Sequence, residues 1–92
     1  MAAKTDRLQW VDVVSSNVQA VAYDELTRLI CVRFIGGGLY SYEYMGEELN
    51  PGEVFTGLAH AVSVGSYLDT VIKKGNFAYK AWFSEDELLQ SL

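Results

Sequence analysis

The sequence predicts a single α+β domain, an antiparallel β-meander of three to four strands packed with two short helices and followed by a C-terminal tail helix. Three observations support this prediction. The chain has 92 residues, the size of one domain, so 1–92 is treated as one unit. Up to about position 45, apolar and polar residues alternate between turn signals, as they do in strands. Helix-start signals recur from about position 50, and strands followed by helices favour α+β over α/β.

The first two strands are predicted from short apolar segments. Val11–Val14 predicts the first strand, and a Ser-Ser-Asn turn follows it. Residues 18–23 predict the second strand, in which side chains alternate between two faces. One face holds Val18, Ala20 and Ala22, and the other holds Gln19, Val21 and Tyr23. Asp24–Thr27 then predicts a hairpin, because an Asp side chain can bond the backbone two residues further on.

The strongest strand signal lies in the middle of the sequence. Residues 28–35 (RLICVRFI) are apolar at nearly every position, which predicts a central strand covered on both faces, with Arg28 and Arg33 near its ends. Gly36–Gly38 predicts a tight hairpin, since glycine adopts positive φ without steric cost. Leu39–Met45 predicts the next strand, with Tyr40, Tyr42 and Tyr44 on one face. A sheet curled toward a small open barrel is the alternative arrangement.

Two helix starts follow the strands. At Asn50 the order Asn-Pro-Gly-Glu places a capping side chain before the proline and glutamate that are typical of a first helical turn. This helix is expected to reach about Ala61. The second helix is expected to begin at Ser66, in another capping box. It would end near Lys73 and Lys74, because cations complement the C-terminal end of the helix dipole.

The last segment, 80–92, combines aromatic residues with one more helix signal. A third capping box at Ser84 predicts a tail helix, and Phe83 and Leu88 are spaced for a hydrophobic staple across its start. About nine residues cannot form a stable helix alone, so this tail must dock on the body or on a partner. Its apolar residues and the aromatic pair before it are the candidate interface: Trp82, Phe83, Leu88, Leu89 and Leu92.

Composition excludes several classes of protein. The chain carries 7 Lys+Arg against 12 Asp+Glu, a net charge of −5, which argues against an extended, non-specific nucleic-acid surface. No apolar run reaches the ~18 residues of a membrane span, and the N-terminus leads into no apolar signal segment. We therefore expect a cytoplasmic protein without membrane contact. One cysteine excludes an internal disulfide framework and a thiolate zinc site.

Catalytic chemistry has few candidate residues. His60 is the only histidine and Cys31 the only cysteine, and neither comes with a pattern that guarantees a nucleophile, base and orienting partner. We interpret His60 as a helix-surface residue and Cys31 as a small core residue. The glutamates around positions 43–53 are expected to be solvated rather than metal ligands. The chain is accordingly expected to be no enzyme, and to bind neither metal nor cofactor.

Ser63–Ser66 is the first candidate binding segment. It precedes a predicted helix, whose N-terminal amides and partial positive charge can hold a phosphate. Gly65 would allow close backbone approach, and Ser63 or Ser66 would add a hydroxyl. The competing interpretation is that the two serines only cap the helix and the glycine only turns the chain.

The tyrosine face is the second candidate. Tyr40 and Tyr42 could stack nucleobases, as sheet-based single-strand binders do, with Arg33 or Lys73 supplying charge. The competing interpretation is that this face packs under the helices, in which case base stacking on this strand fails.

Several segments, in order, resemble the KTSC domain, a small bacterial and phage domain named for the C-terminus of some lysyl-tRNA synthetases. The resemblance covers about residues 12–79, and its most specific parts are the Tyr-x-Tyr strand and the Ala-x-Ser-x-Gly-x-Tyr segment. The segments that carry it are Val14–Val18, Tyr23-Asp24, Leu29–Phe34, Tyr40–Tyr42, Pro51, Val54-Phe55, Ala61–Tyr67 and Ile72-Lys73. The resemblance implies RNA binding only through the synthetase association.

These observations lead to one functional hypothesis and one alternative. The hypothesis is a non-enzymatic binding module for a phosphate-bearing ligand, either a nucleotide-like small molecule or a short RNA. It places the phosphate near Ser63, Gly65 and Ser66. The alternative is a protein-interaction or accessory module, phage-encoded among the possible origins, that forms a homo-oligomer or holds a partner through the aromatic and helical C-terminal segment.

Overall fold

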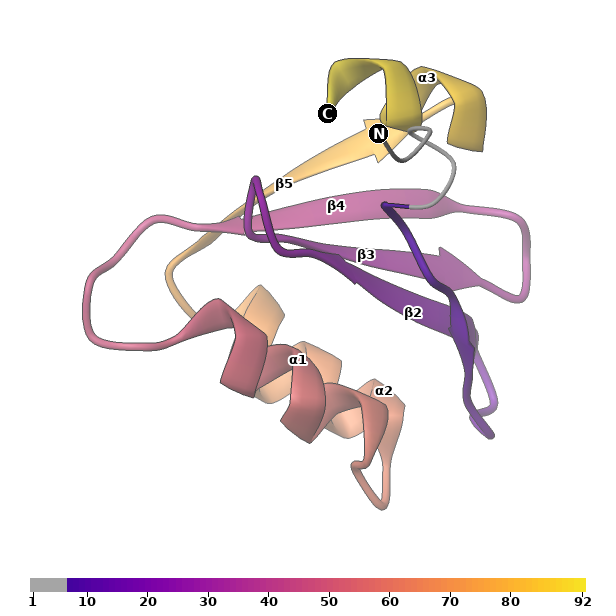
Figure 1. The fold of residues 1–92 in the computed structure, drawn as a ribbon. Helices are drawn as coiled ribbons and strands as arrows, with labels where there is room; N and C mark the ends of the chain where they lie inside the picture. Colours follow the sequence, from indigo (N-terminus) through magenta and orange to yellow (C-terminus); the bar gives the residue numbers. More distant parts are fainter. Residues whose placement is uncertain (1–6) are drawn as a thin grey trace.

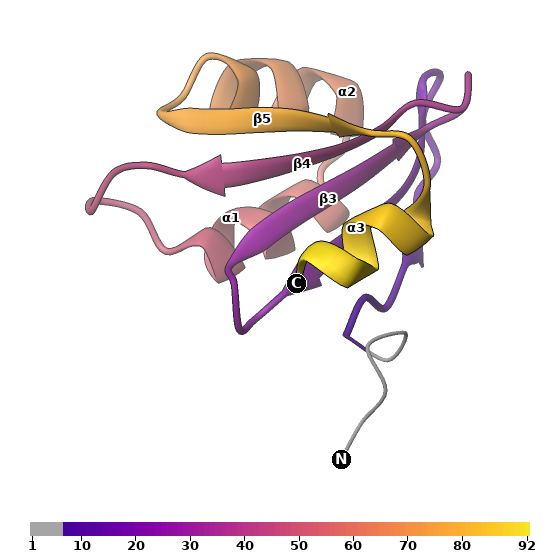
Figure 2. The ribbon, with the colours of Figure 1, turned by 90° about the horizontal axis from the view of Figure 1, so that it is seen from above.

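The computed structural model describes residues 7–92 and confirms the α+β class. Five strands form one antiparallel sheet in sequence order: β1 (Val11–Asp12), β2 (Val18–Asp24), β3 (Leu29–Phe34), β4 (Leu39–Tyr44) and β5 (Phe77–Trp82). The helical segments are α1 (Pro51–Ala59), α2 (Val64–Tyr67), its π-helical continuation η2 (Leu68–Lys73) and α3 (Glu85–Ser91). α1 and α2 cover one face of the sheet, and α3 lies on the other (Figure 1 and Figure 2).

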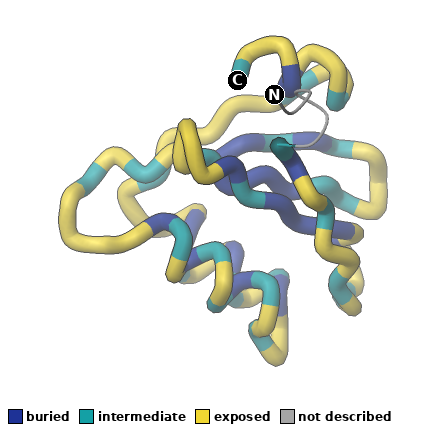
Figure 3. Tube along the Cα trace, viewed as in Figure 1, coloured by how far each residue is buried: buried dark blue, intermediate teal, exposed yellow. Residues whose placement is uncertain are grey.

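The sheet has one strand more than the three to four predicted. β5 pairs with β4 in a regular antiparallel register, from Tyr44 opposite Phe77 to Leu39 opposite Trp82. Its four middle residues are all exposed, as Figure 3 also shows along the strand. The strand therefore lacks the apolar alternation by which a sequence identifies a half-buried strand. β1 and β5 are the two edges of this open sheet.

A β-bulge in β2 overturns the predicted division of that strand into two faces. Val18 lies opposite Phe34 and Ala20 opposite Arg33, so one extra residue is accommodated near Gln19. Beyond the bulge the facing of the side chains is reversed relative to Val18. Val18 consequently shares the helix-covered core with Val21 rather than with Ala20 and Ala22.

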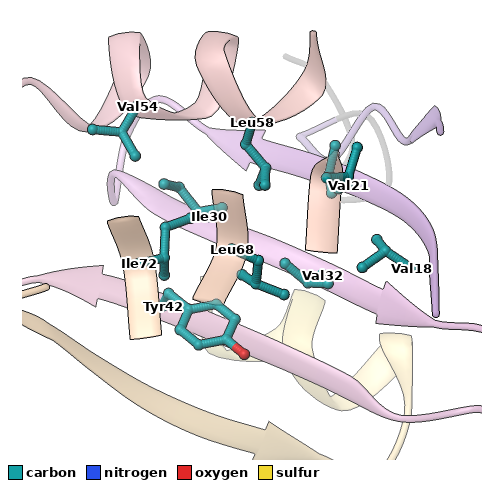
Figure 4. Close-up of a cluster of buried hydrophobic side chains, with 10 residues drawn as sticks. Val18, Val21, Ile30, Val32, Tyr42, Val54, Leu58, Leu68 and Ile72 are labelled. Carbon is teal, nitrogen blue, oxygen red and sulfur yellow. The ribbon is translucent and has the colours of Figure 1, made fainter. Parts of the chain in front are cut away.

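The central strand β3 divides two hydrophobic cores, which confirms that it is covered on both faces. Ile30 and Val32 face the larger core, beneath α1, α2 and η2 (Figure 4). Cys31 faces the smaller core, beneath α3. The buried members of the larger core are Val18, Val21, Ile30, Val32, Tyr42, Val54, Leu58, Val64, Leu68 and Ile72.

The helix starts were predicted correctly at Asn50 and three residues too late at Ser66. The Asn50 side chain accepts hydrogen bonds from the amides of Gly52 and Glu53. The second helix begins at Val64, and Ser63 is its cap. A start at Val64 buries that residue on one stripe with Leu68 and Ile72, which a later start would not do. No helix within residues 7–92 is long and apolar enough to cross a membrane.

The tail helix α3 docks on the body of the domain. Ser84 caps it as predicted, accepting from the Glu87 amide at 3.2 Å. Leu88 and Leu89 are buried against the sheet with Leu8 and Cys31. The predicted staple is wrong, because Leu88 points into this core while Phe83 is 96% exposed.

Candidate ligand-binding groove

An aromatic groove opens on the helix-covered face of the sheet, at the end where β3 turns into β4. Its cavity volume is about 570 Å³. The β3–β4 hairpin forms one wall, β5 forms the opposite wall, and the end of η2 lies between them. The lining residues are Phe34, Gly36, Gly38, Tyr40, Tyr42, Lys73, Phe77 and Tyr79.

The rings of the groove form a continuous aromatic wall. Tyr40 lies at its centre, with ring centroids 5.6 Å from Phe34, 6.5 Å from Tyr42 and 6.2 Å from Tyr79. Tyr42 is buried, and burial raises the pKa of its hydroxyl to about 12. Tyr79 is 71% exposed, so it offers a free ring face to a ligand. The wall thus has a buried base at Tyr42 and an exposed rim at Tyr79.

Lys73 supplies the positive charge of this groove. Its ammonium nitrogen lies 5.4 Å from the centre of the Phe34 ring, and the side chain is exposed. It is the only cationic residue among the groove's lining residues. A planar ring stacked on the tyrosines could therefore carry an anionic group toward Lys73.

Two glycines shape the hairpin wall. Gly37 has a φ of 99°, a conformation that side chains other than glycine rarely adopt. At Gly38 an added Cβ would lie 3.2 Å from the Tyr40 ring, tighter than ordinary contact. The glycine run that predicted a hairpin thus also lets Tyr40 lie flat against the turn.

The structure brings together only part of the predicted site. Tyr40, Tyr42 and Lys73 line one groove, although Lys73 is far from the two tyrosines in sequence. Arg33 lies on the opposite face, where its guanidinium bonds Glu85 at 2.5 Å and stacks 4.5 Å over the Trp10 ring. Alternation along β3 explains this, since Arg33 is one residue away from the groove-facing Phe34.

Ser63, Gly65 and Ser66 lie at the other end of the helix from Lys73. Ten residues separate Ser63 from Lys73, which corresponds to roughly 15 Å along a helix. Ser63 is occupied as a cap, accepting from the Ser66 amide at 3.3 Å. An added Cβ at Gly65 would lie 3.0 Å from the Asn17 amide oxygen, so this glycine lets the β1–β2 turn approach the helix. The predicted anion segment thus makes packing and capping contacts and lies apart from the aromatic groove.

The turn that meets Gly65 is itself held by side chains. Ser15 Oγ donates to Asn17 Oδ1 at 3.0 Å and accepts from the Val18 amide at 3.2 Å. Further along the helix, Tyr67 donates its hydroxyl to the Val54 carbonyl at 3.1 Å and ties α2 to α1. The Ser-Ser-Asn and Ser-x-Gly-x-Tyr segments therefore meet in space and join sheet and helices.

Three residues of the groove were missed by sequence reasoning: Phe34, Phe77 and Tyr79. Phe34 was assigned to the central strand without a face. Phe77 and Tyr79 were assigned to no element, because β5 was not predicted. Phe77 and Tyr79 are two residues apart in a strand next to the Tyr-x-Tyr strand, so their side chains lie on the same face as those tyrosines. This spacing is the signal that could have identified them.

A second, larger cleft of about 950 Å³ lies at the opposite end, between the β2–β3 turn and α1. Tyr23 and Phe55 stack within it at 5.6 Å. Two of its charged groups pair with each other: Arg7 donates to both carboxylate oxygens of Asp24, at 2.9 and 2.6 Å, while Glu25 and Glu53 also line the cleft. Burial acts to raise the pKa of Asp24, yet the hydrogen bonds from Arg7 and Thr27 hold it below its ordinary value. The Arg7–Asp24 pair therefore has a structural role beside the β2–β3 turn.

The candidate interface residues of the tail lie mostly inside the chain. Leu88 and Leu89 are buried, and Leu92 and Trp82 pack against the same core. The Trp82 indole donates to Ser41 Oγ at 2.8 Å, and the Lys80 ammonium lies 4.2 Å over the ring. Only Phe83 of the five offers its side chain freely to a partner.

The residues with catalytic potential lie apart. Cys31 is fully buried beneath α3, and burial raises its pKa to about 12. His60 is exposed at the end of α1, where Nδ1 lies 2.9 Å from the Thr56 carbonyl oxygen. Within residues 7–92, no three His, Cys, Asp or Glu side chains gather as a metal site would require.

Comparisons with known proteins identify a family and two similar proteins. The family model of the KTSC domain matches residues 14–77. A protein of Tsukamurella paurometabola is 34% identical over 61 residues, which are 66% of this chain and 84% of that protein. The crystal structure of a KTSC domain protein from Yersinia pestis superposes with a TM-score of 0.68 at 29% identity, covering 82% of this chain and 97% of that chain.

Proposed function

Since the chain belongs to the KTSC domain family, we propose that it is a non-enzymatic binding module of that family, whose aromatic groove recognises a phosphate-bearing ligand. The ligand class is a nucleotide-like small molecule or a short RNA stretch, which share a planar base and a phosphate. One observation carries the proposal: an exposed tyrosine, Tyr79, continues a wall of packed rings that ends beside an exposed Lys73.

The base would stack on Tyr79 at the rim of the groove. Aromatic side chains hold bases of any sequence through their π faces, typically contributing about 1–3 kcal/mol per base. Tyr40 and Tyr42 support this ring from behind, so little side-chain freedom is lost when a ligand binds. Stacking on Tyr79 replaces the stacking on Tyr40 or Tyr42 that the sequence predicts, because Tyr42 is buried and Tyr40 is only partly exposed.

The phosphate would lie against Lys73 rather than at Ser63–Ser66. Lys73 belongs to the groove, whereas Ser63 already caps its own helix and α2 has only four residues. The groove has a single lysine and the chain has a net charge of −5, which together favour a short ligand over a long nucleic-acid backbone. We therefore expect the binding affinity to fall with salt concentration as it does for about one phosphate contact.

The surroundings of the two most reactive side chains support the non-enzymatic part of the proposal. Cys31 is buried and holds its proton, and His60 faces solvent without a nucleophile beside it among the described residues. The proposal includes a cytoplasmic location, where an unpaired thiol such as Cys31 stays reduced.

A binding experiment with one matched pair of variants tests the proposal. The probes are adenosine monophosphate, followed by calorimetry, and a fluorescein-labelled six-nucleotide RNA, followed by anisotropy. Tyr79→Ala is expected to weaken binding about fivefold or more, because one stacking contact is lost. Leu26→Ala, at an 81% exposed site in the β2–β3 turn, is the control and should bind as the parent does. Equal affinity of the Tyr79→Ala variant, or no binding of either probe, would contradict the proposal.

The protein-interaction alternative loses most of its surface in this structure. Leu88 and Leu89 stabilise the chain's own core, so the tail helix does not need a partner to cover it. Phe83, 96% exposed, remains as the one apolar residue of that surface. A partner that uses the tail would have to contact Phe83.

A further inference from the structure

The outer edge of β5 has the properties of a pairing surface. The strand is six residues long, contains no proline and pairs with β4 without a bulge. Within residues 7–92 no other strand lies on its outer side. Long, regular edges of this kind are ready to accept another strand, and proteins usually blunt them with bulges, prolines or charges. Lys80 is the one charged residue in β5.

We propose that β5 pairs antiparallel with β5 of a second copy of this chain, around a two-fold axis at Tyr79, so that two sheets become one. This inference does not rest on the proposed function. Its occupant is a second copy because the strand's own sequence is complementary to itself in one register.

Symmetry limits the registers that are available. Residues directly opposite each other in an antiparallel pair point to the same face. A two-fold axis perpendicular to the sheet keeps the same face of both copies on the same side. Each residue must therefore lie opposite a residue whose number is also odd, or also even. Two registers then pair five residues within Phe77–Trp82, one centred on Tyr79 and one centred on Lys80.

Charge selects between these two registers. The Lys80 register would place two ammonium groups directly opposite each other, which is destabilising. The Tyr79 register places Ala78 opposite the second copy's Lys80 and Ala81 opposite the second copy's Phe77. Glu43 lies next to Ala78 in the same row of the sheet, is exposed, and pairs with no cation among residues 7–92. The small Ala78 leaves room for the second copy's Lys80 to turn from its own Trp82 ring toward Glu43.

The two-fold axis also joins the binding grooves. Tyr79 faces Tyr42 across β4 and β5, so the two Tyr79 rings would meet on the groove face. A groove now open past the sheet edge would gain a wall from the other copy. Each site would then be completed by the second copy's Tyr79.

The first test measures the dimer dissociation constant of the ligand-free protein by light scattering after size exclusion, so that it is independent of ligand binding. Lys80→Glu and Glu43→Lys should each weaken the dimer roughly fivefold, and the double variant should recover the parent affinity. Leu26→Lys, which adds one positive charge far from β5, should leave the dissociation constant unchanged. A monomer at every concentration up to about 1 mM, or a double variant no better than the single ones, would overturn the proposal.

The second test fixes the register. Tyr79→Cys should form a disulfide dimer on mild oxidation, because cross-strand Cβ atoms lie about 5 Å apart. The native Cys31 is buried and does not compete. The Lys80→Cys variant should stay monomeric in denaturing gels. In this register position 80 lies opposite position 78 of the second copy, so the two new cysteines do not face each other. Cross-linking of the Lys80→Cys variant and not of the Tyr79→Cys variant would overturn the proposed axis.

Discussion

Arg7 donates two parallel hydrogen bonds to Asp24, from Nε to Oδ1 at 2.9 Å and from Nη2 to Oδ2 at 2.6 Å. The pair joins the N-terminal segment to the end of β2, and the Asp24 side chain is only 3% exposed. The same carboxylate accepts hydrogen bonds from the Thr27 amide and hydroxyl, which close the β2–β3 turn. One buried carboxylate therefore holds both the turn and the N-terminal segment.

The first prediction concerns the pH dependence of stability. The pKa of Asp24 is lowered in the folded chain, so its contribution is complete above the unfolded value near 3.8 and is lost as pH falls through the folded value. Arg7→Ala should cost about 3 kcal/mol of unfolding free energy at neutral pH, because it leaves a buried carboxylate unpaired. It should also flatten the fall in stability below about pH 4. Urea unfolding at several pH values would show this. A parent and variant with parallel pH profiles would count against it.

The second prediction separates capping from ligand binding at Ser63. Ser63→Ala removes the side chain that accepts from the Ser66 amide, so it should destabilise the chain by about 1 kcal/mol. Ligand affinity should not change, because this residue lies at the other end of the helix from the groove. Ser66→Ala is the control, since its exposed hydroxyl does not cap α2. Loss of nucleotide binding in a folded Ser63→Ala protein would contradict this prediction and support phosphate binding at Ser63–Ser66.

The third prediction tests the charge of the groove. Lys73→Gln should weaken binding of adenosine monophosphate several-fold and leave binding of adenosine nearly unchanged, because only the phosphate contact is removed. It should also lower the salt slope of binding by about one. Lys74→Gln is a close control, since Lys74 pairs instead with Asp69 at 3.7 Å. Equal losses of affinity for adenosine monophosphate in the two variants would indicate a general charge effect rather than a site at Lys73.

The fourth prediction distinguishes core from interface in the tail. Leu88→Ala should lower the free energy of unfolding by about 3 kcal/mol, because Leu88 is fully buried in the core under α3. Phe83→Ala should change stability by less than about 0.5 kcal/mol, as expected for an exposed side chain. Thermal and denaturant unfolding would measure both. A stable Leu88→Ala protein that loses a binding partner would revive the tail as an interface.

Local signals predicted most of this fold. The glycine hairpin, the Asn50 and Ser84 caps and the central strand β3 each depend on residues close in sequence, and each was confirmed. The bulge near Gln19 and the strand β5 were not predictable in the same way. A bulge depends on how β2 fits β3, and β5 is set by its pairing with β4 rather than by a pattern of its own.

The candidate site was predicted in part, for the same reason. Tyr40, Tyr42 and Lys73 were chosen for their chemistry, and the fold brings them together. Arg33 was misplaced because one step along a strand moves a side chain to the opposite face. Ser63 was misplaced because the length of a helix separates it from Lys73. Residue type thus suggested the candidate residues, while spacing in the fold decides which of them can act together.

The family match ends at residue 77, where β5 begins. A fragment cut at that border would lose β5 and α3, and the face formed by Ala22, Cys31 and Leu39 would be bare. Such a fragment would expose both an unpaired β4 and an apolar sheet surface, which is a combination that promotes aggregation. The segment that the family model matches is therefore smaller than the unit in which these two surfaces are covered.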